Sequence, residues 1–339
     1  MGLWPFIIRR FLLSILVLLM VSTGTFLLAH AAPGDPVETI LGDRVANNPE
    51  IRAAAEKKYG FDKPLPEQYL TYVKNLFRGD LGDSISTRRP VMTDLRQFVP
   101  GTFELAFSAL CFALLFGIPL GIIAAVKRDK WPDHVARFLS LTGTSIPVFW
   151  LALILLFVFF YRLHWAPGPG RLDIGMEAPP RVTGLITVDA LIDRNWSAWW
   201  SSVRHMILPA IALGAYAMGI IARMLRSSLL TSLNDDYVRT ARAKGLTERE
   251  VIVRHALRNA MIPTVTVIGL TTASLLAGAV LTETIFSWPG IGRYGVDAAR
   301  TLDYPALFGV TLVVAIAYIA INFIVDIIYA LLDPRIRVQ

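Results

Sequence analysis

Ionisable side chains that interrupt the long apolar runs of this chain are the first candidates for chemistry. Glu104 and Glu283 lie near the ends of two runs, and Asp326 lies late in the last run, one turn after Asn322. Charged groups are costly in lipid, so they mark packing contacts, proton relays or transport pathways. For Glu104 and Glu283 we expect an interfacial role, with pathway lining as the alternative. Asp326 and Asn322 are expected to serve helix packing rather than a proton relay.

Signatures of catalysis are missing from the sequence. No glycine directly precedes a lysine, so the phosphate-cradling GxxxxGK[ST] loop is absent. None of the five histidines is followed by glutamate, which excludes the HExxH zinc helix, and Gly143 to Pro147 lacks the last glycine of a nucleophile elbow. A single cysteine, Cys111, permits neither an intrachain disulfide nor a cysteine-based metal cluster. The sequence therefore predicts a non-catalytic chain without a cofactor or metal of its own.

The longest strongly polar segment in the second half of the chain runs from Asn234 to Pro263. Asp235 and Asp236 favour a helix N-terminus there, and Arg239 is placed for an i,i+4 pair with Asp235. Gly245 can adopt the left-handed conformation that ends a helix. One short helix is therefore expected before Gly245.

A second helix is expected to begin immediately after Gly245. Thr247 and Glu250 have the spacing of a capping box, and apolar residues then recur with helical spacing up to Pro263. The segment is thus a helical hairpin between two apolar runs. It is either a solvated connection or an element on which a partner docks.

The composition is that of a membrane protein. Hydrophobic residues make up 54% of the 339 residues and charged residues 17%, whereas a soluble domain has about 25% charged residues. The net charge of +7 does not indicate nucleic-acid binding, because no basic run is interleaved with aromatic stacking residues. Spanning the hydrocarbon core takes about 20 helical residues. Six apolar runs qualify: Phe11 to Ala29, Leu105 to Val126, Phe138 to Tyr161, Met206 to Ala222, Asn259 to Thr282 and Tyr304 to Val325.

The fold class expected is an all-α integral membrane protein with six transmembrane helices. If the N- and C-termini are placed in the cytoplasm, the short inner segments contain sixteen Lys and Arg residues and the short outer loops contain seven. Because Lys and Arg are enriched in short cytoplasmic loops, we expect this orientation. Arg223 and Arg226 are expected to snorkel at the inner boundary of the fourth span. Although Ala29 to Ala31 imitates a signal-peptidase site, the preceding apolar run is longer than the about 15 residues of a signal peptide, so we expect an uncleaved span.

Three parts are expected along the chain: residues 1–30 with the first span, an extracytoplasmic cap at 31–101, and a five-helix core at 102–339 that includes the polar loop 234–258. Within the cap, Val91, Leu95, Phe98 and Val99 fall on one helical face, which predicts an amphipathic helix on the membrane surface.

Close approach of the spans is predicted from small residues. Gly117 and Gly121 form one pair at i,i+4, and Ala215 and Gly219 form another. Prolines 119, 147 and 209 can kink the spans that contain them. Helix packing is the expected role of all of these residues, and bending during gating is the alternative.

An unusually apolar loop joins the last two spans. It contains Phe286, Trp288, Pro289 and Gly290, and therefore combines two aromatic rings with a Pro-Gly turn. Two placements remain open for it. The loop either rests on the lipid surface or folds back as a gate over the outer mouth of a pathway.

Several motifs resemble, in order along nearly the whole chain, the dipeptide/oligopeptide branch of the binding-protein-dependent inner-membrane components of ABC importers. They are APGDP (32–36), GFDKPLPEQY (60–69), GDLGDS (79–84), GIPLGIIAAVKR (117–128), DDYVRTARAKGL (235–246), HALRNAMIPTVT (255–266), LTETIFSWPGIGRY (281–294) and VDIIYALLDPRIR (325–337). The resemblance implies that the polar loop is the ATPase-coupling loop. Its contact residues would be Asp236, Tyr237, Arg239, Thr240, Ala241, Arg242, Ala243, Lys244, Gly245 and Leu246.

The resemblance further implies a multi-pass permease of the bacterial inner membrane that imports dipeptides or oligopeptides. Its partners would be a second, homologous permease, two cytosolic ATPase subunits that hold ATP and Mg²⁺, an extracytoplasmic peptide-binding protein and membrane lipid. Permeases for nickel or glutathione look much alike and remain alternatives. An ion-coupled secondary transporter is the alternative from another class, but it would need ionisable groups near the midplane of the membrane.

Overall fold

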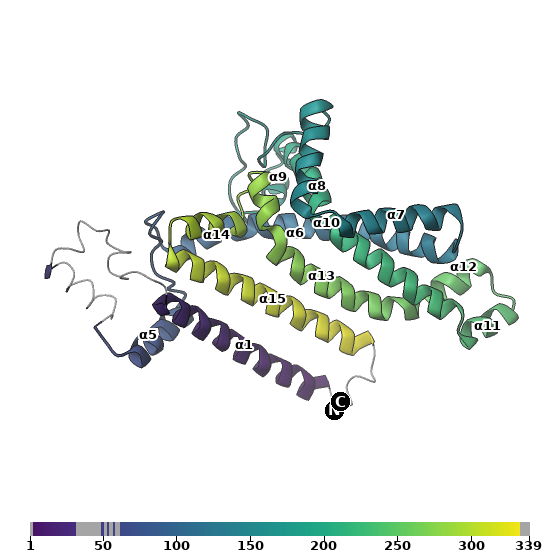
Figure 1. Ribbon diagram of the computed structural model, residues 1–339, viewed down its shortest axis with the longest axis horizontal. Helices are drawn as coiled ribbons and strands as arrows, with labels where there is room; N and C mark the ends of the chain where they lie inside the picture. Colours follow the sequence, from purple (N-terminus) through teal and green to yellow (C-terminus); the bar gives the residue numbers. More distant parts are fainter. Residues whose placement is uncertain (1–2, 32–48, 51–52, 54–56, 58–61, 333–339) are drawn as a thin grey trace.

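The computed structural model describes the whole chain except residues 1–2, 32–48, 51–52, 54–56, 58–61 and 333–339. The regular secondary structure of the described residues is helical, apart from one isolated bridge between Asp83 and Pro90. In chain order the α-helices are α1 (Leu3–Ala31), α5 (Leu65–Phe77), α6 (Val91–Val126), α7 (Trp131–Ser145), α8 (Val148–Leu155), α9 (Ile186–Ile192), α10 (Trp196–Leu233), α11 (Asp236–Ala243), α12 (Glu248–Glu250), α13 (Leu257–Ile285), α14 (Ile291–Arg300) and α15 (Tyr304–Leu332). Two π-helices, η1 (Leu156–Arg162) and η2 (Val251–Ala256), complete the set. Helices α11 and α12 lie at one end of the long axis, and α5 and α14 lie at the other (Figure 1).

Among the described residues, five helices are long and apolar enough to cross a membrane, and a bent pair of helices gives a sixth. This agrees with the six predicted spans. At 1.5 Å per residue, the 36 residues of α6 and the 38 of α10 reach well beyond a hydrocarbon core of about 30 Å. Both helices begin before the predicted spans, because Glu104 and Arg204, which ended the apolar runs in the sequence, lie inside continuous helices.

The third predicted span, Phe138 to Tyr161, is not a single straight helix. Helix α7 ends at Ser145, and the segment Val148–Arg162 continues at an angle of 107° to it. Pro147 sits at this break and lacks the backbone N–H that a continuous helix would use. Pro119 and Pro209, by contrast, lie within the uninterrupted helices α6 and α10. Only Pro147 therefore accompanies a sharp change of direction.

Helix α10 is the most buried of the spanning helices and packs closely against α6. A Cβ added at Gly121 would lie 2.9 Å from both the carbonyl oxygen of Ala222 and the Cβ of Leu225. Gly117 similarly faces Met218. Glycine is needed at these places because any side chain would push the two helices apart. The predicted role of the small residues in helix packing is confirmed.

The apolar face at the start of α6 has a different partner from the one predicted. Val91 and Leu95 are buried in a cluster with Ile291 and Tyr294 of α14, and the ring of Phe98 stacks on Tyr294 at 5.0 Å between centroids. The residues belong to one long helix and pack on protein rather than on the membrane surface. The predicted apolar face is therefore present, but it contacts α14 instead of the membrane surface.

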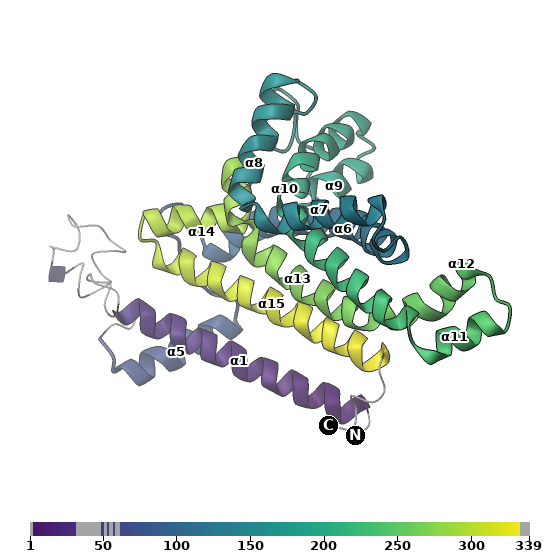
Figure 2. The ribbon, with the colours of Figure 1, turned by 45° about the vertical axis from the view of Figure 1, so that its right-hand side comes forward.

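Helix α1 runs along the edge of the molecule beside α15 (Figures 1 and 2). Arg10 of α1 forms an ion pair with Asp326 of α15, with 3.1 Å between Nη1 and Oδ2. The amide of Asn322 donates to the carbonyl of Tyr318 within α15. The ion pair of Asp326 is the contact expected of a helix-packing group, whereas the amide of Asn322 bonds within its own helix. Much of the predicted cap, at residues 32–48 and in most of 51–61, lies outside the described residues.

Candidate functional site

The predicted coupling-loop segment folds as one short helix followed by a tight turn. Gly245 has φ +78°, and its N–H donates to the carbonyl of Arg242 at 2.9 Å, so α11 ends as predicted. Asp235 precedes the helix with an extended backbone (φ −71°, ψ 151°). Its carboxylate therefore does not share a helical face with Arg239. The predicted Asp235 pair is wrong, because Arg239 pairs with Asp236 at 3.4 Å.

The next helix begins with the predicted capping box. Thr247 Oγ1 accepts from the N–H of Glu250, and the Glu250 carboxylate accepts from the N–H of Thr247 at 3.2 Å. The helix continues through Pro263 into the predicted fifth span, since α12, η2 and α13 follow one another without a loop to Ile285. The turn at Gly245 is thus joined directly to the fifth spanning helix.

A small apolar cluster seats α11 on the rest of the molecule. Val238 and Ala241 are its buried residues on α11, and they pack with Leu225 and Leu229 of α10 and with Val251 of η2. Arg242 holds the turn from outside through Glu248, with 2.7 Å between Nη2 and Oε1. The turn at Gly245 is therefore held on both sides, by the apolar cluster under α11 and by the ion pair of Arg242 with Glu248.

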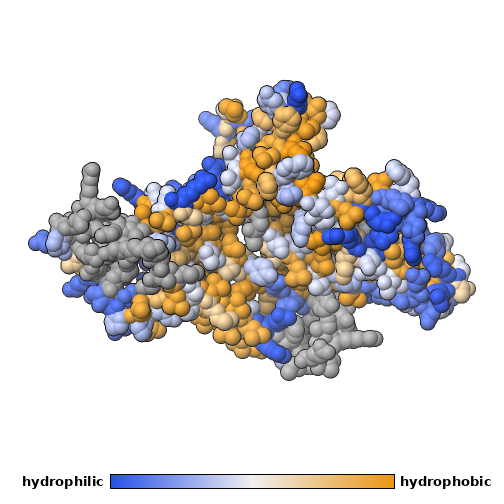
Figure 3. All heavy atoms as spheres, in the orientation of Figure 1, coloured by the Kyte–Doolittle hydropathy of each residue, from blue (hydrophilic) through white to orange (hydrophobic). Residues whose placement is uncertain are grey.

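The opposite face of α11 is open to solvent. Hydrophilic residues gather over the end of the molecule formed by α11 and α12 (Figure 3). Of the predicted contact residues, Ala241 is turned inward, whereas Asp236, Tyr237, Arg239, Thr240, Arg242, Ala243, Lys244, Gly245 and Leu246 are exposed. A partner could reach nearly the whole predicted set at once.

Replacing Thr247 with alanine is expected to destabilise the start of α12 by about 1 kcal/mol, since the N–H of Glu250 would lose the Thr247 hydroxyl that accepts its hydrogen bond. Faster hydrogen exchange of the amides at 248–251 in the purified complex would report this loss. Thr311→Ala is the matched control, because the Thr311 hydroxyl only donates to a carbonyl within α15. Equal exchange in the two variants would show that the capping box does not hold the turn.

The apolar loop after α13 folds into the protein. Phe286 is buried in a cluster with Ala152 and Leu155 of α8, and Trp288 is completely buried against α6 and α10. The indole N–H of Trp288 donates to the carbonyl of Gly101 at 2.8 Å. Pro289 is half-buried and Gly290 is buried. Of the two predicted placements, resting on the lipid surface is wrong.

Glu283 anchors this loop to the start of α6. Its carboxylate, completely buried, accepts from the hydroxyl of Thr102 at 2.5 Å and from the N–H of Arg293 at 2.9 Å. Thr102 in turn accepts from the N–H of Ile291 at 2.8 Å. A side chain at Gly290 would overlap the carboxylate. Glu283 therefore binds the loop and α14 to α6 and is not free to contact a substrate in this structure.

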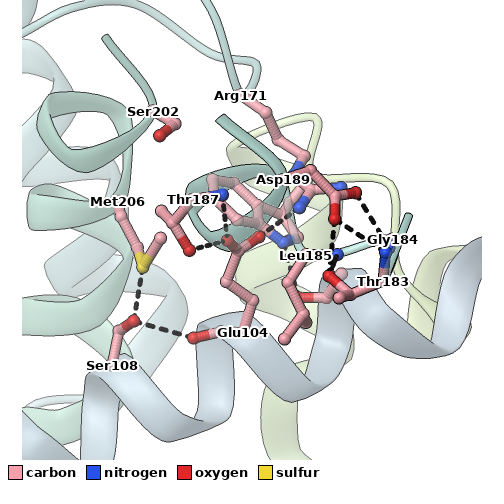
Figure 4. Close-up of polar contacts among 12 residues, drawn as sticks. Glu104, Ser108, Arg171, Thr183, Gly184, Leu185, Thr187, Asp189, Ser202 and Met206 are labelled. Carbon is pink, nitrogen blue, oxygen red and sulfur yellow. Dashed lines mark hydrogen bonds and ion pairs between the residues drawn. The ribbon is translucent and has the colours of Figure 1, made fainter. Parts of the chain in front are cut away.

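Glu104 has an equivalent role toward the segment between η1 and α10 (Figure 4). It is nearly buried on α6, forms an ion pair with Arg171, and accepts from the backbone N–H of Thr187 at 2.9 Å and from its hydroxyl. The guanidinium carbon of Arg171 also lies 5.2 Å from the ring centroid of Trp288. Arg171 thus contacts both Glu104 and Trp288. These partners of Glu104 were missed, because nothing local in the sequence links them.

Asp189 stabilises the same loop from within α9 (Figure 4). Burial by itself would raise the pKa of its carboxyl group, but hydrogen bonds from Thr183 and from the backbone of Gly184 outweigh burial and hold that pKa below its ordinary value. The carboxylate therefore stays charged and keeps the turn before α9 closed.

A buried ion pair near the coupling end was also missed. Asp133, completely buried at the start of α7, accepts from Nε and Nη2 of Arg226, each at 2.9 Å. Arg137 lies 3.3 Å from the same carboxylate. The prediction that Arg226 snorkels to the boundary is wrong, since the residue joins α10 to α7.

Two models of protein families match this chain. The model described as binding-protein-dependent transport system inner membrane component matches residues 117–338, and the model of its N-terminal part matches residues 3–106. The chain belongs to this family. The permease is accordingly a component of the bacterial inner membrane, in agreement with its apolar helices.

Similar proteins cover the permease from end to end. It is 48% identical over 334 residues to the di/tripeptide transport system permease protein DppB of Pseudomonas aeruginosa, which spans 98% of this chain and 99% of that protein. It is 45% identical over 336 residues to the probable D,D-dipeptide transport system permease protein DdpB of Escherichia coli, covering 99% and 98%. A glutathione transport system permease protein, GsiC of Salmonella choleraesuis, is 38% identical over 333 residues, covering 98% of each chain.

Proposed function

We propose that the permease imports dipeptides or oligopeptides as the membrane subunit of an ATP-driven transporter. The relatives at 45–48% identity are named for dipeptide or di/tripeptide transport, whereas the glutathione permease stands at 38%. This difference favours peptides over glutathione, and no similarity described above favours nickel. A proton- or sodium-driven carrier is disfavoured by the family itself.

The proposed transporter contains four further subunits. A second, related permease lies beside this one, two cytosolic ATPase subunits carry ATP and Mg²⁺, and an extracytoplasmic binding protein delivers the peptide. The permease itself is not an enzyme and binds no cofactor or metal. The exposed face of α11, from Asp236 to Ala243, receives one ATPase subunit.

The orientation of the permease follows from this contact. The end that carries α11 faces the cytoplasm, and the ion pair between Arg10 and Asp326 brings the start of α1 beside the end of α15. Both termini are therefore cytoplasmic, and the segment 31–101 lies outside the cell as a cap. Residues 1–30 and 102–339 make up the first span and the five-helix core.

Rigid-body transmission is the proposed mechanism. The single observation that carries it is the absence of a loop between Thr247 and Ile285, because any motion that the turn at Gly245 receives from α11 passes straight into α13. Val238 and Ala241 transmit the same motion to α10 through their shared cluster. Closure of the ATPase subunits would then tilt α10 and α13 together.

Inserting Gly-Ser after Gly245 tests the mechanism. We expect the assembled complex to hydrolyse ATP but to lose uptake of labelled dipeptide into proteoliposomes, since a flexible turn no longer transmits the tilt. The control is the same insertion after Gly175, a loop glycine of the opposite half that also has positive φ (84°) and open space around it. Normal uptake by the Gly245 variant would disprove rigid transmission, and ATP-independent uptake by the unaltered complex would disprove the proposed function.

A further inference from the structure

The few exposed residues of α10 in its membrane-spanning part are mostly polar, and the polar ones share one face. Between Met206 and Leu233 the exposed residues are Ile207, Tyr216, Arg223, Ser227 and Thr231. With 3.6 residues per turn, the last four fall within roughly 80° of one another, whereas Ile207 points the opposite way. We call Tyr216, Arg223, Ser227 and Thr231 the α10 strip. Ile220, which is half-buried, lies among them.

Neighbouring helices leave the α10 strip uncovered. On one side α7 approaches closely, with Gly143 against Ala215 and Gly219 against Ser140. On the other side Ala217 shares a cluster with α13. Helix α6 packs on the opposite face of α10, so the strip lies between α7 and α13 and faces away from α6 (Figures 1 and 2).

The strip is closed at its outer end. On the helical turn before Tyr216, Ala212 is completely buried in a cluster with Ala152 and Leu155 of α8 and with Phe286. The 107° bend after α7 carries α8 across α10 at this point. From Tyr216 to Ser227 the strip runs about 16 Å along the axis toward the coupling end. It is therefore blocked on the outer side and open on the side of α11.

The chemistry of the strip is not that of a lipid-facing surface. Exposed residues of α6 show what such a surface looks like, since they include Phe103, Phe107, Leu115 and Ile123. In contrast, the strip presents hydroxyl groups and a guanidinium at the same depth, which are costly in hydrocarbon. Among the residues that the structure describes, no carboxylate pairs with Arg223, because the nearby Asp133 is taken by Arg226. Such a surface suits water, a polar solute or a polar partner rather than hydrocarbon.

We propose that the α10 strip is this permease's wall of the peptide pathway, with Tyr216 at its closed outer end and Arg223 as a counter-charge for the peptide carboxylate. The inference rests on the proposed function. A small peptide fits both features, because its backbone needs hydrogen-bonding hydroxyl groups and its C-terminus carries a negative charge. Glu104 and Glu283, for which pathway lining was the alternative prediction, are occupied in holding the outer loops.

Thiol accessibility in the assembled transporter tests the wall. In a Cys111→Ser background we would introduce Tyr216→Cys, Ser227→Cys or, as the control, Leu115→Cys, which is exposed on α6 near the same depth. The probe is a membrane-impermeant sulfonated thiosulfonate applied from the cytoplasmic side. Because the reaction needs a hydrated thiolate, we expect the two strip positions to react at least about ten-fold faster than position 115.

Dipeptide delivered by the binding protein should slow labelling at position 216 several-fold and leave position 115 unchanged. If the strip positions react no faster than position 115, or if peptide has no effect on them, the strip packs on the second permease and the proposal is overturned. ATP-dependent dipeptide uptake by the Cys111→Ser background is measured first, so that a failure of the proposed function is seen separately.

Substitution of Arg223 tests the counter-charge. At saturating liganded binding protein, Arg223→Gln should lower peptide uptake about ten-fold, since a charged hydrogen bond is lost, while Arg223→Lys retains most of the rate. Wild-type ATP hydrolysis in both variants would show that the coupling end is intact. Undiminished uptake by Arg223→Gln would mean that Arg223 only reaches lipid head groups, and it would overturn this role.

Discussion

Trp288→Ala is expected to lower the free energy of unfolding of the permease by about 3–5 kcal/mol, as large-to-small changes of buried aromatic residues do. Trp288 is completely buried in the main cluster between α6 and α10. Its loss would also leave the carbonyl of Gly101 without the indole donor and Arg171 without its ring. The outer closure of the strip should weaken as well, because Phe286 belongs to the same loop.

Thermal unfolding of the purified complex in nanodiscs measures the effect. Trp200→Ala is the matched control, since Trp200 is an exposed tryptophan at the start of α10 and should change stability little. Trp288→Phe separates packing from hydrogen bonding: it keeps most of the ring volume and should lose only about 1–3 kcal/mol. If Trp288→Ala is as stable as Trp200→Ala, the loop is a loose flap and not a packed closure.

Local signals explain why the coupling segment could be predicted from the sequence. The end of α11 at Gly245 and the capping box of Thr247 and Glu250 depend on backbone geometry within a few residues, and both are confirmed. The predicted ion pair of Asp235 with Arg239 is wrong because Asp235 lies one residue before α11 begins, so its side chain is not on the helix. Boundaries are therefore the weak point even where the element is correct.

Long-range contacts could not be predicted in the same way. Two charged residues, Glu104 and Arg204, limited the predicted second and fourth spans at their starts. Helices α6 and α10 nevertheless continue through these two residues. Burial of Glu104 is tolerated because Arg171 and Thr187 meet it from another loop, and no local pattern specifies such partners. The face of Val91 and Leu95 illustrates the same limit, since hydrophobic periodicity does not distinguish lipid from a neighbouring helix.

The bend after α7 is a third kind of limit. Pro147 marks a position where the helix can break, but the angle of 107° depends on where α8 finds packing partners. Those partners are Leu208 and Ala212 of α10. Because α8 closes the outer end of the α10 strip, the candidate pathway could be located only after this tertiary contact was known.

Asp133→Ala is expected to be the most destabilising charge deletion at the coupling end, at about 3–5 kcal/mol, because removing one partner of a buried ion pair leaves the other charge uncompensated. Asp133 is completely buried, and Arg226 donates to both of its oxygens. Asp297→Ala is the control, because the Asp297 side chain is exposed and pairs with Arg293 of the same helix, α14, at 4.0 Å; such surface pairs contribute about 0–1 kcal/mol.

The paired variant Asp133→Leu with Arg226→Met decides what the ion pair is for. Replacing both buried charges by apolar groups of similar size is often neutral for stability, so unfolding near the wild-type temperature is expected. Uptake should nevertheless fall if the bidentate geometry fixes α7 against α10 beside Arg223 and Ser227. Stable protein with full uptake would show that the ion pair only compensates its own burial, and that other contacts set the width of the strip.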